Sequence, residues 1–160
     1  MNKKIYVWSA AAVICAAALF FYLRGSGDFN VYDEFGIARS RFSYVNWNAS
    51  FAMFSAEVSE VLNSRTFRTK DGAIITLYGA SNALRPEEAR DFMKKEIEGK
   101  PVVIFVCGAP EDYSGIVRAI VFYAKGKRCL NKDMYDAGFF DVKIKNEYFF
   151  AEGWFDAETD

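Results

Sequence analysis

The sequence predicts a five-stranded β-barrel of the OB type, with helices, preceded by one N-terminal transmembrane α-helix. Two observations indicate this. Residues 5–23 are apolar at 18 of 19 positions and carry no charge. The chain after residue 50 follows the order strand, strand, strand, helix, strand, strand, helix, which is the order of an OB barrel with its helix between strands three and four. The predicted parts are an N-terminal tail at 1–4, the transmembrane helix at 5–23, a linker at 24–50, the barrel at 51–140 and a C-terminal tail at 141–160.

Length and composition restrict the class of protein. The 160 residues suffice for one ordinary domain with an appendage, and they exclude two large catalytic domains. Charges nearly balance, with 20 basic and 21 acidic residues, so the composition is not that of a disordered chain. The sequence has no histidine. This excludes Ser-His-Asp and Cys-His nucleophilic sites and removes the commonest zinc ligand.

The apolar segment 5–23 is long enough to cross a bilayer. As a helix it reaches about 28 Å, close to the thickness of the hydrocarbon core. Lys3 and Lys4 precede it, so the positive-inside rule predicts that residues 24–160 lie on the side opposite the cytoplasm or matrix. The alternative is a cleaved signal peptide, because small residues such as Ala16–Ala18 could form a cleavage site.

The first half of the predicted barrel consists of strands. Apolar and polar residues alternate over 54–62, and further strands are predicted over 65–72 and 73–80. Asp71-Gly72 marks a hairpin turn between the last two. Residues 24–50 mix aromatic and polar residues without a clear period, which indicates a linker that packs on another surface.

A helix is predicted over Pro86–Glu98. Pro86 suits the first helical position, and Glu87 and Glu88 suit the first turn because carboxylates interact favourably with the helix dipole. Gly99 is a typical stop. The expected apolar face consists of Ala89, Phe92, Met93 and Ile97.

The second half adds two strands and a short helix. The β-branched run 101–108 predicts a buried strand, and 116–123 predicts another. Residues 131–137 predict a helix capped by Asn131 and ending before Gly138.

Four short motifs then occur in order along residues 54–140: VLNSRTF at 61–67, ITLYGA at 75–80, PEEARDF at 86–92, and Leu130-Asn131 followed by Gly138-Phe139. Their order and spacing resemble the motifs of the staphylococcal nuclease (thermonuclease) family. The order of strands and helices agrees with the same family. The resemblance therefore implies a barrel like that of the family, here carrying an N-terminal transmembrane anchor.

The resemblance also implies which residues would form a catalytic site. The family cleaves nucleic-acid phosphodiesters with Ca²⁺, which requires carboxylates on the metal, a general base and arginines that stabilise the phosphate charge. The family's site positions are all occupied by other residue types: Arg65 and Ser81 at the metal-binding aspartates, Leu84 at the general base, Thr76 at one arginine, and Gly115 or Val117 at the other. We therefore expect no catalytic residues, no bound metal and no cofactor.

Two functional alternatives remain open. Glu87, Glu88 or Asp112 could replace the missing carboxylates, which would make the chain a membrane-anchored nuclease. The chain could instead bind nucleic acid without cleaving it, with a basic patch formed by Arg65, Arg68, Lys70 and Arg118. Residues 51–160 contain 15 basic and 18 acidic residues, a net charge of −3, which argues against phosphate binding.

The cysteines and the C-terminal residues carry the remaining predictions. Cys15 lies in the predicted membrane span, whereas Cys107 and Cys129 are expected to be core-lining thiols rather than a disulfide. From residue 147 onward, aromatic residues alternate with five acids and no base. This pattern predicts a segment that docks on a partner.

Together these observations predict a non-catalytic accessory or structural subunit of a membrane protein complex. Its partners would be other subunits of that complex and the lipid bilayer, with nucleic acid disfavoured. We expect the mitochondrial inner membrane, in a respiratory-chain or ATP-synthase assembly; the alternative is a bacterial inner membrane with a periplasmic domain.

Overall fold

The computed structural model describes residues 31–50, 52–108, 115–142 and 148–150. The predicted transmembrane helix at 5–23 lies outside these residues. Within the described part of the chain, no helix combines the length and the apolar character needed to cross a membrane.

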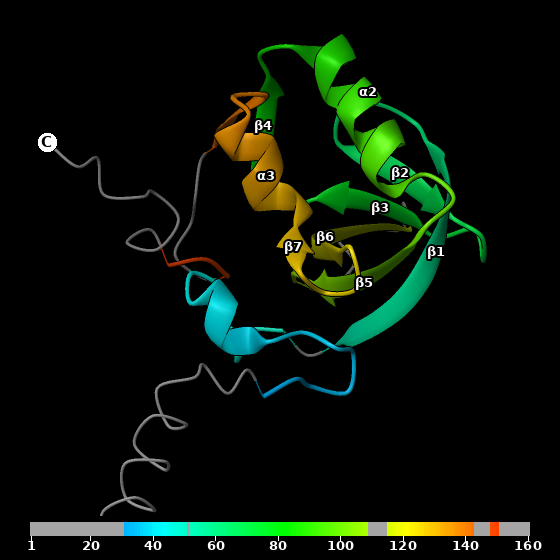
Figure 1. Ribbon diagram of the computed structural model, residues 1–160. Coiled ribbons are helices and arrows are strands. Elements are labelled where there is room, and N and C mark those ends of the chain that lie inside the picture. Colours follow the sequence, from blue (N-terminus) through cyan, green and yellow to red (C-terminus); the bar gives the residue numbers. More distant parts are fainter. Residues whose placement is uncertain (1–30, 51, 109–114, 143–147, 151–160) are drawn as a thin grey trace, which may run out of the picture. The chain divides into compact units, whose positions relative to one another are not determined.

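Five strands form a closed mixed β-barrel, as the sequence predicted (Figure 1). They are β1 (Met53–Val61), β2 (Thr66–Thr69), β3 (Ile74–Leu77), β5 (Pro101–Val106) and β6 (Ile116–Tyr123). Along the sheet their order is β3-β2-β1-β5-β6, and β3 pairs with β6 to close the barrel. The closing pair is parallel and the other four are antiparallel. This pairing is consistent with an OB-like fold.

Helix α2 (Pro86–Ile97) lies between the third and fourth barrel strands, as predicted. Pro86 occupies the start of the helix, where its missing N–H costs nothing. Ala89, Met93 and Ile97 are fully buried at helical spacing and join the barrel core. Gly99, with φ of +71°, takes a left-handed conformation after the helix end.

The barrel encloses a filled apolar core. Its buried members come from every barrel strand, from α2 and from α3 (Leu130–Asp136). The interior is a packed core and not a channel, because side chains from all these elements meet there. The largest of the fully buried residues in this core are Phe67, Ile75, Met93, Ile97, Ile104 and Leu130.

The strand predicted over 73–80 was wrong in its extent. Strand β3 ends at Leu77, and Gly79, with φ of +78°, turns the chain out of the barrel. A separate strand β4 (Ala80–Ala83) follows and pairs with β8 (Phe140–Val142) in a two-stranded sheet. A glycine at a positive φ permits this sharp change of direction, which the continuous apolar pattern concealed.

The predicted helix cap at Asn131 was also wrong. Helix α3 begins at Leu130, directly after the short strand β7 (Arg128–Cys129), and no side chain caps it. Asn131 lies inside the helix and is 6% exposed. Its Oδ1 accepts from Val121 N at 2.9 Å, and its Nδ2 donates to Tyr78 O at 2.9 Å and Ala119 O at 3.2 Å. The side chain therefore ties α3 to the barrel where β3 and β6 meet.

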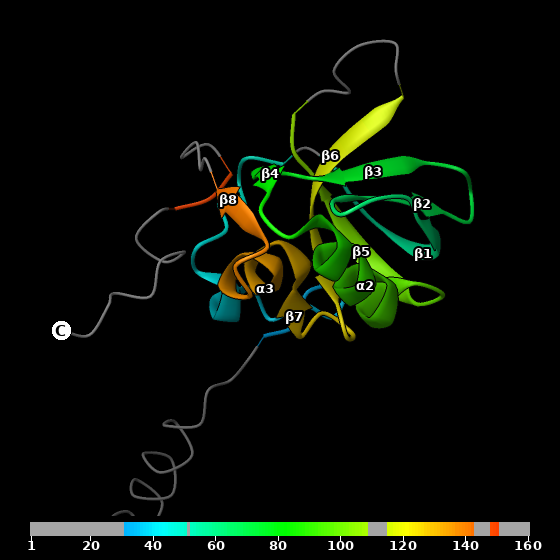
Figure 2. The same cartoon turned by 90° about the horizontal axis from the view of Figure 1, so that it is seen from above.

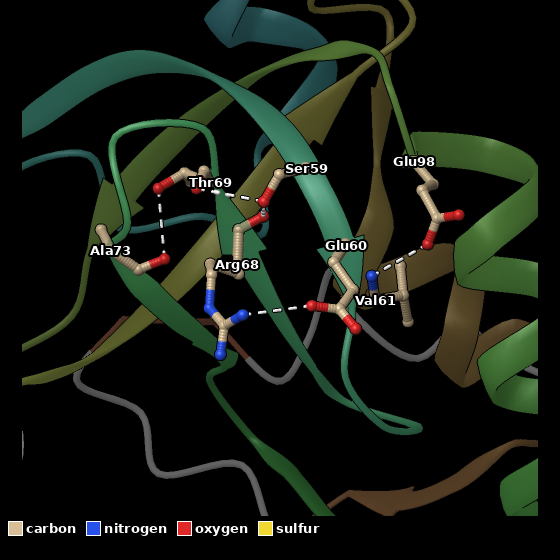
Figure 3. A network of polar contacts seen from close by, with 7 residues as sticks. All are labelled: Ser59, Glu60, Val61, Arg68, Thr69, Ala73 and Glu98. Atoms are coloured by element: carbon tan, nitrogen blue, oxygen red, sulfur yellow. Dashed lines mark hydrogen bonds and ion pairs between the residues drawn. The ribbon is translucent and has the colours of Figure 1, made fainter.

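A bulge at Ser59 lets the long strand β1 bend around the barrel. The register between β1 and β2 shifts between Val58 and Glu60. Ser59 Oγ lies 3.1 Å from the carbonyl oxygens of both Arg68 and Thr69 (Figure 3). Beyond the bulge, Glu98 Oε2 accepts from Val61 N at 2.9 Å, which links the strand to the end of α2. Polar side chains thus replace ladder hydrogen bonds at the irregular positions.

Residues before and after the barrel form a second apolar cluster on the outer face of β5 and β6. The segment containing the short 3-10 helix η1 (Arg39–Phe42) contributes Ile37, Phe42 and Val45, all buried. They pack with residues of β5 and β6 that point away from the interior, namely Val103, Phe105, Ile120 and Phe122, and with Cys129 of β7. The part of the predicted linker from residue 32 onward belongs to the same compact unit as the barrel.

The described C-terminal aromatics pack on the chain itself. Tyr148 is 6% exposed and Phe149 is fully buried in the second cluster. Phe149 forms an antiparallel bridge with Val45, with Asn46 N donating to Tyr148 O at 2.8 Å and Phe150 N donating to Tyr44 O at 2.7 Å. We had expected aromatics from residue 147 onward to dock on a partner. For Tyr148 and Phe149 this was wrong, because the apolar face they cover is formed by the same chain.

Candidate functional site

The degenerate site predicted from the resemblance centres on Arg65, in the turn between β1 and β2. The turn is fixed locally, since Arg65 N donates to Asn63 Oδ1 at 3.0 Å. Leu77 N donates to Arg65 O at 2.9 Å, which holds the turn against the end of β3. The guanidinium Nη1 then reaches β4, where it donates to Ala80 O at 3.1 Å and Ser81 O at 2.9 Å. Arg65 and Ser81, the two positions that the resemblance assigns to metal-binding aspartates, are therefore in contact.

This contact has a direct electrostatic consequence. A fixed positive charge already lies on the two carbonyl oxygens, which are the kind of hard ligand that Ca²⁺ prefers. A dication about 4 Å from the guanidinium would be repelled by about 2 kcal/mol even at the dielectric constant of water, and by more if the site were desolvated. Because Arg65 is exposed, the lower figure applies. The arrangement favours an arginine-bridged structural contact over a cation site.

Thr76 lies in the barrel wall beside this contact. Its Oγ1 is 3.0 Å from Thr66 Oγ1 on the neighbouring strand. On its other side the parallel register places Thr76 opposite Arg118 of β6. The resemblance assigns the family's second arginine position to Gly115 or Val117. In the fold it is the neighbouring residue Arg118 that lies in line with Thr76.

The other two site positions lie at the ends of strands. Leu84 directly follows β4, its N–H donates to Phe139 O at 2.9 Å, and its side chain is 63% exposed. Gly115, with φ of +67°, immediately precedes β6. Neither residue type supplies an acid, a base or a cation, so neither contributes chemistry to the contact between Arg65 and Ser81.

Two of the carboxylates considered as replacements, Glu87 and Glu88, lie in the first turn of α2. Glu88 Oε2 pairs with Arg85 Nη1 at 3.0 Å at the start of α2, and Glu87 is exposed in the same turn. Asp112 lies outside the described residues. Among the residues that the structure describes, no three His, Cys, Asp or Glu side chains are grouped so that they could hold a metal ion.

The predicted basic patch is largely neutralised on β2. Arg68 Nη1 pairs with Glu60 Oε2 at 3.1 Å (Figure 3). Lys70 Nζ pairs with Glu57 Oε1 at 2.6 Å. Each cation therefore faces a carboxylate on β1, which reduces the positive potential that a phosphate backbone requires.

The two described cysteines are free and buried, as predicted. Burial raises the pKa of Cys129 to about 12, although hydrogen bonds from Lys132 N and Tyr44 act in the opposite direction. Burial also raises the pKa of Tyr44, and the neighbouring Cys129 adds to that effect. The thiol is therefore protonated at neutral pH and is a poor nucleophile.

A polar cluster that no sequence pattern predicted joins β6, β7 and α3. Tyr123 Oη donates to Asp133 Oδ2 at 2.7 Å, and Arg128 Nε donates to the same oxygen at 3.0 Å. The Arg128 guanidinium also lies 5.1 Å from the centre of the Tyr123 ring. Burial, followed by the bond to Asp133, raises the pKa of Tyr123. No sequence motif identifies this cluster, because its members are brought together by the β6–β7 hairpin.

No known protein-family model matches the chain, and no curated protein matches its sequence. The assignment to the thermonuclease family therefore stays a prediction from the four motifs. The barrel and its helices are established independently of it by the strand pairing described above.

Proposed function

We propose that the chain is a non-catalytic accessory subunit of a membrane protein complex. In this proposal residues 5–23 anchor it in the bilayer, and a degenerate thermonuclease-like barrel makes contacts with other proteins. The observation that carries the proposal is the contact of Arg65 with the Ala80 and Ser81 carbonyl oxygens. This contact supports the proposal that the family's cation site is replaced here by hydrogen bonds that join the β1–β2 turn to β4.

The chemistry of the residues at the site disfavours hydrolysis. Phosphodiester cleavage needs a means of activating water and a means of stabilising the charge that develops on the phosphate. Leu84 cannot accept a proton, and Arg65 opposes the binding of a dication. Arg118 is a cation in line with Thr76, and alone it supplies neither the base nor the metal.

Exposed apolar side chains, and aromatic residues in the sequence beyond the described residues, favour protein partners. Leu84 is 63% exposed beside the contact between Arg65 and Ser81. Trp154 and Phe155 continue the aromatic pattern of the C-terminal segment. Large apolar side chains of this kind are typical of the centres of protein interfaces. A subunit of a mitochondrial inner-membrane assembly, or of a bacterial inner-membrane complex, is the setting that this combination favours.

The decisive experiment measures the size of the native particle. The full chain, extracted from its own membrane in a mild detergent, is expected to migrate on a native gel within a complex much larger than 18.1 kDa plus detergent. Subunits that co-migrate through a second purification step would then be identified. Migration as a single chain would contradict the proposal.

A second measurement tests the absence of catalysis. The full chain is expected to leave single-stranded DNA and RNA intact in the presence of Ca²⁺ or Mg²⁺. If cleavage occurred and was lost in Glu87→Ala or Glu88→Ala, with Lys94→Ala as the matched control on the same helix, the chain would be a nuclease with relocated carboxylates.

Nucleic-acid binding without cleavage is a second candidate, favoured by the alignment of Arg118 with Thr76 on the barrel wall. It predicts retention on single-stranded DNA that weakens steeply with salt. Nucleic-acid binding would be supported if Arg118→Gln abolished retention on single-stranded DNA and Arg90→Gln did not. No retention at low salt would exclude it.

A further inference from the structure

The turn between β6 and β7 carries Lys125 and Lys127, and it holds Ala124 and Lys125 in a conformation that is unusual for residues with a side chain. Ala124 and Lys125 have φ of 52° and 59°, in the left-handed region, where Cβ clashes with the backbone. Gly126 follows with φ of 73°. Lys125 and Lys127 are exposed, and within the described residues neither ammonium group has an ion pair. Strained backbone that persists in a fold is a reason to look for function at the same place.

The turn is fixed by its contact with another turn. Gly126 is buried, and a Cβ built on it would lie 2.7 Å from Gly36 O and 2.9 Å from Ile37 Cγ1. The β6–β7 turn therefore packs directly on the turn that begins at Tyr32, so that two segments 90 residues apart meet. Figure 2 shows β7 beside the blue start of the described chain. Lys125 and Lys127, which flank Gly126 and are both exposed, therefore lie close to the turn formed by residues 32–38.

The N-terminal turn adds an aromatic ring and a further cation. Tyr32, which bridges to Ala38, is 56% exposed. Arg41 in η1 is exposed and has no ion pair among the described residues. Arg39, by contrast, is paired with Asp33 at 2.9 Å. We call Tyr32, Arg41, Lys125 and Lys127 the basic corner.

The acids around the basic corner are mostly neutralised. Asp133 and Glu96 on the two helices both face Arg128, at 3.0 and 4.0 Å. Asp33 is taken by Arg39. Within the part of the chain that the structure describes, Glu34 is exposed and has no ion pair. Among the described residues of these two segments, three exposed cations and one exposed carboxylate have no ion pair, although the region 51–160 is acidic as a whole.

We propose that the basic corner docks on anionic lipid headgroups of the bilayer that holds residues 5–23. The inference rests on the proposed membrane anchor. Nine residue steps separate Leu23 from Tyr32, and a fully extended chain of that length reaches about 31 Å. Basic residues near a bilayer surface are attracted to anionic lipids, and tyrosine is enriched at the same depth. The length of the connecting chain, the positive charge and the exposed Tyr32 ring are thus all consistent with docking on anionic lipid headgroups.

The test uses the full chain with Cys15→Ser, inserted in nanodiscs that contain either 30% phosphatidylglycerol or phosphatidylcholine alone. A nitroxide label is placed at Glu34→Cys beside the basic corner, or at Glu87→Cys at the start of α2 as the matched control. Both replace an exposed glutamate. Cys107 and Cys129 are buried and should not take the label. The depth of the label is measured from two collision rates: that of the nitroxide with oxygen, which partitions into lipid, and that of the nitroxide with a water-soluble nickel chelate.

We expect the label at position 34 to lie at headgroup depth in the anionic discs and to move towards water in the neutral discs or at high salt. The label at position 87 should stay in water throughout. Combined Lys125→Gln and Lys127→Gln should weaken docking about fivefold for each lysine removed. Combined Lys94→Gln and Lys95→Gln, two exposed lysines on α2, should leave docking unchanged.

Several results would overturn the inference. The two labels could be equally accessible to the chelate in anionic discs, or the label at position 34 could be equally shielded in both lipids. The inference would also fail if the Lys125/Lys127 and Lys94/Lys95 double substitutions weakened docking equally. If the chain were washed from the discs by alkaline carbonate, the membrane anchor itself would fail. If it remained inserted with the label at position 34 in water, the docking surface alone would fail.

Discussion

Replacing Phe149 by alanine should destabilise the domain strongly, although Phe149 lies far from the barrel strands in the sequence. Its side chain is fully buried and packs with the Tyr78 ring at a centroid distance of 5.9 Å, while its backbone bridges to Val45. Truncating a fully buried phenylalanine costs about 3–5 kcal/mol in lost burial and in the cavity that remains. That is a large part of the 5–15 kcal/mol typical of a domain.

The neighbouring residue supplies a matched control. Phe150 is 46% exposed, so Phe150→Ala should cost less than about 1 kcal/mol, since substitutions at exposed sites have small effects. The assay is urea unfolding of the full chain in a mild detergent, followed by circular dichroism. Such measurements resolve differences of about 0.5 kcal/mol. If Phe149→Ala and Phe150→Ala lowered the free energy of unfolding by amounts that agree within this limit, the C-terminal aromatics would not be part of the folded domain. The account of the second cluster would then be wrong.

Three further predictions concern single positions. Asn131→Ala should cost about 3 kcal/mol, because Val121 N loses its acceptor and the carbonyl oxygens of Tyr78 and Ala119 each lose a hydrogen bond, whereas exposed Asn63→Ala, which loses one turn bond, should cost about 1 kcal/mol in the same urea assay. Ala124→Gly should stabilise the protein by about 0.5–1 kcal/mol by relieving the left-handed strain, and a lower melting temperature would refute this. The folded-state pKa of Cys129, raised from 9.0 to about 12, means that the folded state retains a proton that the unfolded state loses. Stability should therefore fall as pH rises from 9 towards 12, and Cys129→Ala should remove about 1.4 kcal/mol per pH unit of that fall; equal pH slopes of unfolding free energy for the two proteins would contradict it.

The sequence predicted the barrel because local and alternating patterns specify strands and helices directly. The helix at Pro86–Ile97 is an example: its start, its buried face at Ala89, Met93 and Ile97, and the following glycine are all local signals. The closure of the barrel followed from the order of elements. The break at Gly79 did not, because a continuous apolar run does not show where its strand leaves the sheet.

The site was predictable only in part. The motifs assigned Arg65 and Ser81 to related roles, and the structure places them in contact through the guanidinium. No pattern indicated that the Asn131 side chain would hydrogen-bond to the barrel strand β6. An asparagine before a helical run ordinarily suggests a cap on the helix N-terminus. The cluster of Tyr123, Arg128 and Asp133 was equally invisible, because a hairpin and not a motif brings its members together.

The sequence by itself determined the order of elements, the filled apolar interior and the residue types at the site positions that the resemblance assigns. These properties depend on residue type and spacing. The tertiary structure decided where the flanking segments go. It buries Phe149 against Val45 and sets the β6–β7 turn on Gly36, pairings between residues about 90 or more positions apart. Such contacts depend on which apolar surface remains uncovered after the barrel closes, and one-dimensional periodicity does not contain that information.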